Sequence, residues 1–138
     1  MPGRDVGAIF VDTGAWFASV IPWDANHTDA VAWLGQNQET LVTTDYVLDE
    51  TLTLLRVRNE SARALILGEQ LFSRQLGELY FLKEADVNEA WKVFRDFADK
   101  EWSFTDCTSK VAMEILGVKT AFAFDQHFRQ FGTVQVAP

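Results

Sequence analysis

Short apolar segments alternate along the chain with longer stretches in which apolar residues recur at helical spacing. The apolar segments lack helical periodicity and stop at polar or turn-forming residues, which is typical of buried strands in a parallel sheet. We predict strands at 8–11, 41–43, 79–82, 121–124 and 133–136. We predict helices at 15–20, from 26 or 28 onward, at 45–57, 61–74, 86–98 and 105–116, and through 128–131. This alternation indicates one α/β domain over residues 1–138, a three-layer α/β/α fold with a mostly parallel central sheet.

Two of the predicted strands stop at an aspartate. Asp12 follows the apolar residues that end at Val11, and Asp125 follows those that end at Phe124. Parallel strands end on one edge of an open sheet, where ligands bind. If the two strands are neighbours, about 4.8 Å apart, the carboxylates nearly touch. Each aspartate could instead cap the helix that follows it.

Two more acids extend this set. Asp106 lies in the first turn of a predicted helix, where an acid also complements the helix dipole. Glu50 lies close to the apolar side of the helix at 45–57, and no Lys or Arg lies within one turn of it. A glutamate there needs a partner, either a cation or an arginine from elsewhere in the core.

A cluster of four carboxylates would hold protons unless a cation neutralised it. Oxygen ligands suit Mg²⁺ or Mn²⁺, whereas two histidines and one cysteine make a zinc site improbable. Such ions activate water and stabilise the leaving oxygen of a phosphodiester. We therefore predict a metal site at Asp12, Glu50, Asp106 and Asp125 that hydrolyses a nucleic-acid backbone.

Composition changes this picture in three respects. The net charge of −8 argues against tight, unaided binding to a polyphosphate, so the metal must supply positive charge at the site. The single cysteine excludes an internal disulfide, and the absence of a signal-like or membrane-length apolar run favours a cytoplasmic protein without membrane contact. Five Trp and eleven Phe are many for 138 residues, and those that the core does not absorb would serve a dimer or partner surface.

Four short motifs in order resemble those of the PIN-domain nucleases, and more narrowly those of VapC-type toxins. They are Val11-Asp12-Thr13, Leu48-Asp49-Glu50-Thr51, Ser103-Phe104-Thr105-Asp106 and Ala123-Phe124-Asp125-Gln126-His127-Phe128. The resemblance implies a parallel sheet between helices and acids that hold Mg²⁺ or Mn²⁺ to cut RNA. It makes Asp12, Glu50 and Asp106 the principal ligands, with Asp125 completing the cluster. It also implies a cognate antitoxin whose C-terminal segment covers the acidic groove, and we expect a homodimer.

The remaining polar residues near these motifs have ordinary alternatives. Thr13, Ser103 and Thr105 orient a ligand or cap a helix, and Lys110 reaches the site or pairs with Asp106. We interpret Asp45 and Asp49 as solvated or as helix N-terminal charges, His27 as a surface residue, and His127 as an RNA contact or an exposed histidine without a catalytic role. Basic residues that could form a rim for phosphate are Arg56, Arg58, Arg63, Arg74 and Arg129. The competing functional hypothesis is a catalytically silent PIN-like module that binds RNA or a protein.

Overall fold

The computed structural model describes residues 7–132 and 134–138, and at its centre is a five-stranded sheet in which every neighbouring pair is parallel. The strand order is β3-β2-β1-β4-β5. The strands are β1 (Ile9–Val11), β2 (Leu41–Thr44), β3 (Glu78–Tyr80), β4 (Thr120–Phe122) and β5 (Gln135–Ala137). The central strand β1 lies between β2 and β4, with Val11 opposite Phe122. The predicted parallel α/β sheet is confirmed.

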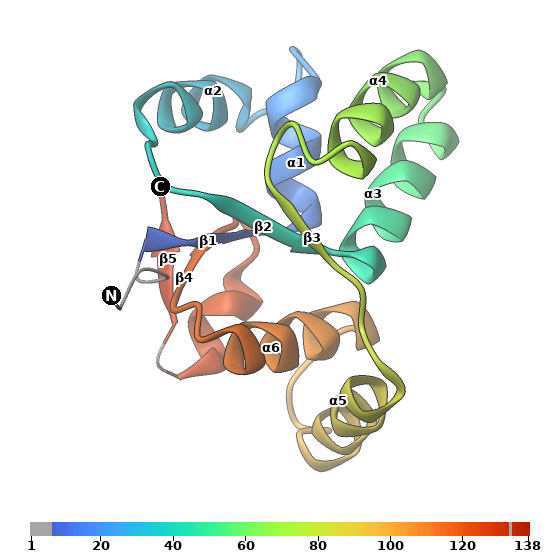
Figure 1. The fold of residues 1–138 in the computed structure, drawn as a ribbon, viewed down its shortest axis with the longest axis vertical. Coiled ribbons are helices and arrows are strands. Elements are labelled where there is room, and N and C mark those ends of the chain that lie inside the picture. The colour runs from blue at the N-terminus through green and yellow to red at the C-terminus, as the bar shows by residue number, and fades with distance from the viewer. Residues whose placement is uncertain (1–6, 133) are drawn as a thin grey trace.

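Helices cover both faces of the sheet (Figure 1). On one side lie α1 (Thr13–Val20), α2 (His27–Gln36), α3 (Asp45–Val57) and α4 (Ser61–Phe72). The other side carries α6 (Phe104–Leu116) and the 3₁₀ helix η2 (Gln126–Phe131), and α5 (Glu84–Asp96) packs against α6. The predicted three-layer arrangement is therefore confirmed.

Local signals set the ends of the helices that flank the carboxyl edge of the sheet. The Thr44 hydroxyl accepts a hydrogen bond from the Val47 amide at 3.1 Å and so caps the start of α3. Gly117 ends α6 with a φ of 70°, a left-handed conformation that glycine adopts at little cost. Because α3 and α6 both begin near this edge, their first turns face the ends of the strands.

Aromatic side chains join η2 to the rest of the core. Phe128 is fully buried and lies against Phe10 of β1, with ring centroids 6.2 Å apart. Phe131 packs edge-on against Trp102, whose indole nitrogen donates to the Gln130 side chain at 2.8 Å. These contacts fix η2 relative to the loop that enters α6, and both segments carry acids of the predicted site.

Apolar residues recur at helical spacing through α4 and α5, which predicts one buried face for each helix, and the structure buries only some of these residues. In α4 the small residues Ala64 and Gly68 face the core, and a Cβ on Gly68 would lie 3.6 Å from the Leu52 side chain of α3. That close approach leaves some larger apolar side chains of α4 in solvent, although Leu67 and Leu71 are buried. In α5, Ala90 is buried while neighbouring aromatic side chains are exposed. The exposed side chains that the periodicity assigned to these faces are Leu65, Ile66, Phe72, Trp91, Phe94 and Phe97.

The predicted element boundaries lie within two residues of the observed ones, and two of the differences concern the predicted site. The strand predicted at 121–124 ends at Phe122, so Asp125 lies three residues beyond it instead of directly after it. The helix predicted at 15–20 begins at Thr13, immediately after Asp12. Part of the last predicted strand, Thr133, lies outside the described residues. Within residues 7–132 and 134–138, no helix has the length and apolar character needed to cross a lipid bilayer.

Candidate metal centre

Asp12 leaves β1 at the carboxyl edge of the sheet with its backbone fully engaged. Its amide donates to the Phe122 carbonyl of β4 at 3.1 Å, and its carbonyl accepts from the amides of Ala15 and Trp16 in α1. The side chain is only 5% exposed and makes no capping hydrogen bond to α1. Helix capping therefore does not account for the Asp12 side chain, because its carboxylate accepts no capping hydrogen bond from α1.

The surroundings of Asp12 favour the protonated acid. Burial raises the pKa of Asp12 from 3.8 to about 7. The nearby Thr13 amide lowers this pKa, whereas the negative charges of Asp106, Glu50 and Asp125 raise it. All three acids are thus within electrostatic reach of Asp12. A cation bound among these groups would reverse the balance in favour of the ionised form.

Asp106 belongs to a reciprocal cap at the start of α6. The Ser103 amide donates to Asp106 Oδ2 at 2.9 Å, and the Asp106 amide donates to the Ser103 hydroxyl at 3.0 Å. The capping alternative is confirmed for Ser103, and Asp106 lies in the first turn of α6, where its charge also complements the helix dipole as predicted. The cap engages Oδ2 and holds the buried carboxylate in one orientation, which is also what a preorganised metal ligand requires.

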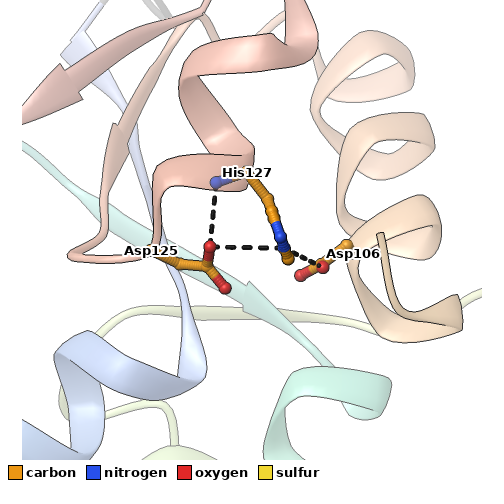
Figure 2. Close-up of side chains that lie close together, drawn as sticks. All are labelled: Asp106, Asp125 and His127. Atoms are coloured by element: carbon orange, nitrogen blue, oxygen red, sulfur yellow. Dashed lines mark hydrogen bonds and ion pairs between the residues drawn. The ribbon is translucent and has the colours of Figure 1, made fainter. Parts of the chain in front are cut away.

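Asp125 and His127 form the opposite side of the cluster (Figure 2). Asp125 Oδ1 accepts a hydrogen bond from the His127 amide at 2.8 Å and so caps η2. The His127 ring returns toward this carboxylate, with Nδ1 3.3 Å from Asp125 Oδ1 and 2.9 Å from Asp106 Oδ2. Asp106 and Asp125, distant in sequence, are brought together by one imidazole.

Glu50 lies on an exposed part of α3, and the prediction that it sits close to the buried apolar face is wrong. Its Oε1 accepts a hydrogen bond from the Thr13 hydroxyl at 2.7 Å, so its partner is neither a core arginine nor a lysine. Thr13 follows Asp12 directly, and this hydrogen bond ties the Glu50 carboxylate to the end of β1.

Several neighbouring polar residues have partners outside the cluster. Lys110 Nζ lies 2.6 Å from Glu114 Oε2, so the prediction that it reaches the site or pairs with Asp106 is wrong. Asp45 accepts a hydrogen bond from the Leu82 amide at 3.0 Å, which gives it a structural role, whereas Asp49 is exposed as predicted.

Cys107 is buried, and burial raises its thiol pKa to about 11, so it is unsuited to act as a thiolate nucleophile.

Four of the five arginines suggested as a phosphate rim have local partners. Contacts of these arginines with RNA stay a prediction, and so does a ligand-orienting role for Thr105. Arg63 binds Glu60 and the Val20 carbonyl, and its guanidinium lies over Trp23. Arg56 donates to Ser61 and Arg74 to the Leu79 carbonyl. Arg58 lies over the Phe17 ring, and Arg129 is exposed.

A polar hollow of about 550 Å³ lies beside the cluster. Asp125, Gln126, His127 and Gln130 line it together with the loop at 99–101. This volume is within the range typical of ligand clefts. The sequence did not indicate the hollow or the position of His127, because both depend on the packing of η2 against the loop before α6.

Comparison with known proteins identifies the family. The model of the PIN domain family matches residues 9–134. The 23S rRNA-specific endonuclease VapC20 of Mycobacterium tuberculosis is 32% identical over 130 residues, which cover 94% of this chain and 98% of that protein. The VapC ribonuclease of Archaeoglobus fulgidus is 32% identical over 126 residues, covering 88% and 79% of the two chains.

A solved structure has the same fold over nearly the whole chain. The crystal structure of M. tuberculosis VapC20, described as a sarcin–ricin loop cleaving toxin, superposes with a TM-score of 0.87. It is 30% identical, and the match covers 94% of this chain and 99% of that one. The chain therefore belongs to the PIN-domain family and, within it, to the VapC ribonucleases.

Proposed function

We propose that this chain is a single-domain, metal-dependent endoribonuclease that hydrolyses RNA phosphodiester bonds as the toxin of a cytoplasmic toxin–antitoxin pair. The observation that carries the proposal is the buried Asp12 carboxylate, which makes no capping hydrogen bond and is repelled by three other acids. Ionising such a group without a counter-ion costs free energy, and a divalent cation offsets that cost. The carboxylate oxygens of the cluster fit Mg²⁺ or Mn²⁺.

In this proposal Asp12, Glu50, Asp106 and Asp125 hold the metal, directly or through water. When bound, the metal ion activates a water molecule and stabilises the oxygen that leaves phosphorus. The hydrogen bonds from Ser103 to Asp106 and from Thr13 to Glu50 fix these carboxylates before the substrate arrives. Ligands oriented in this way need little reorganisation during the reaction.

A structured loop of large-subunit ribosomal RNA is the substrate that we propose. The relatives in M. tuberculosis are 23S rRNA-specific, and the fold similarity to that toxin extends over 94% of this chain. Proteins read RNA sequence chiefly in loops whose bases are splayed out, and the polar hollow beside Asp125 offers room next to the cluster. Because the chain is acidic, the metal would provide the main attraction for the phosphate.

We expect the purified protein to cut a synthetic stem-loop that carries the sarcin–ricin sequence when Mn²⁺ is present. Excess EDTA should abolish cleavage, and renewed Mn²⁺ should restore it. A stem of the same length closed by an unrelated loop is the matched control and should stay intact. If neither RNA is cut with Mn²⁺ or Mg²⁺, the sarcin–ricin loop is not the substrate, and the silent PIN-like module becomes the favoured function.

We further propose that the protein forms a homodimer and binds an antitoxin through a basic segment that enters the acidic groove. Leu65 and Ile66 on α4, and Trp91 and Phe94 on α5, leave exposed apolar surface on both sides of the molecule that a second copy or an antitoxin would bury. Light scattering should give twice the single-chain mass for the isolated protein. A monomer at micromolar concentration would contradict the dimer.

Co-expression with the neighbouring small reading frame should yield a heavier complex that no longer cuts RNA.

A further inference from the structure

The chain has two histidines, and the structure places them in different environments. His27 begins α2, and its Nδ1 lies 2.7 Å from the Ala18 carbonyl, remote in sequence from all acids of the cluster. His127 Nδ1 instead lies between Asp106 and Asp125 (Figure 2). A carboxylate oxygen from each aspartate and one imidazole nitrogen all lie within 4.8 Å of one another.

The separations between these atoms are those of neighbouring ligands around one ion. Two ligands that are each about 2.1 Å from an octahedral metal ion and at right angles lie about 3.0 Å apart. His127 Nδ1 lies 2.9 Å from Asp106 Oδ2 and 3.3 Å from Asp125 Oδ1, close to that edge length on both sides. A single hydrogen bond would place the ring against one carboxylate and does not require the second short separation.

The backbone holds these donor groups in place independently of one another. Asp106 Oδ2 accepts from the Ser103 amide, and Asp125 Oδ1 accepts from the His127 amide. Each carboxylate is thus oriented by a helix cap, and η2 is anchored by Phe128 in the core and by the hydrogen bond between Trp102 and Gln130. A cluster fixed in this way meets the requirement that metal ligands be positioned before the ion binds.

We propose that His127 is a nitrogen ligand of the metal site and that it makes the site prefer Mn²⁺ to Mg²⁺. This inference rests on the proposed metal-dependent function. Mg²⁺ strongly prefers oxygen donors, whereas first-row transition metals accept imidazole nitrogen readily. The mixed set of Asp106, Asp125 and His127 therefore differs from the all-oxygen site expected from the acids alone.

Pulsed electron paramagnetic resonance of Mn²⁺ bound to the full chain, without RNA, tests the assignment directly. A coordinated imidazole nitrogen gives a hyperfine coupling that remote nitrogens do not produce. We expect this coupling in the wild type and in His27→Gln, which removes the other imidazole, and its loss in His127→Gln. Mn²⁺ bound by the wild type without the nitrogen coupling would overturn the proposal for His127 and leave the metal site intact.

Titration calorimetry with each metal gives a second measurement. His127→Gln should weaken Mn²⁺ binding by about tenfold or more and Mg²⁺ binding much less, whereas His27→Gln should change neither. Equal weakening for both metals would mean that His127 only orients Asp106, which contradicts the ligand assignment. Failure of the wild type to bind either metal would overturn the proposed function itself, so the two failures are distinguishable.

Discussion

Replacing Asp12 with asparagine should lower the rate of RNA cleavage by more than about a hundredfold. The substitution keeps the size of the side chain but removes the negative charge that would attract the metal. Residues that merely orient metal ligands typically cost about 10- to 100-fold when they are replaced, so a lost ligand should cost at least as much. The rate is to be measured with purified protein, Mn²⁺ and the stem-loop substrate under single-turnover conditions.

Asp106→Asn should show a loss of similar size, because this carboxylate is also buried and lies within electrostatic reach of Asp12. The chain offers a matched control in Asp49, an exposed acid on α3 next to Glu50, and Asp49→Asn should keep full activity. Circular dichroism should show that each variant folds. Equal cleavage by the wild type, Asp12→Asn and Asp106→Asn would identify a contaminating nuclease and contradict the proposed function.

The carboxyl edge of the sheet was predictable because its signal is local. Short apolar segments that stop at an aspartate predict buried strands, and the parallel alternation of strands and helices sends their ends to one edge. The structure places β1 beside β4, and the Asp12 amide binds the Phe122 carbonyl. The Ser103 and Asp106 cap was predictable for the same reason, since its two residues are three apart in sequence.

The parts that were not predictable depend on contacts between distant segments. Helical periodicity gives α4 more apolar residues than one face can bury. The side that carries Gly68 approaches α3, so Leu67 and Leu71 are buried whereas Leu65 and Ile66 lie in solvent. Glu50 lies near apolar residues in sequence and yet is exposed and bound to Thr13. The direction of the His127 ring depends on where η2 packs, because only that packing brings the ring to Asp106.

The metal-free protein should lose stability as pH rises, and Asp12 should account for most of the loss. Its pKa is about 7 in the folded protein, against 3.8 for an aspartate in water, the value that applies to the unfolded chain. Between these values the unfolded chain releases the proton of Asp12 while the folded chain retains it, so the free energy of unfolding falls with rising pH. The loss begins near pH 4, levels off above about pH 8, and corresponds to about 3 kcal/mol between pH 5 and pH 8.

Urea unfolding in EDTA at a series of pH values measures this loss. Asp12→Asn is the informative comparison because it retains the shape of the side chain but cannot ionise, so its stability should vary with pH by about 3 kcal/mol less than that of the wild type. Mn²⁺ should restore the stability of the wild type at pH 8, since metal binding stabilises the ionised carboxylate. It should do so far less for Asp12→Asn. Identical pH dependence of the two metal-free proteins would mean that Asp12 is not a buried carboxylate that the fold keeps protonated, and the main physical reason for a cation at this site would be lost.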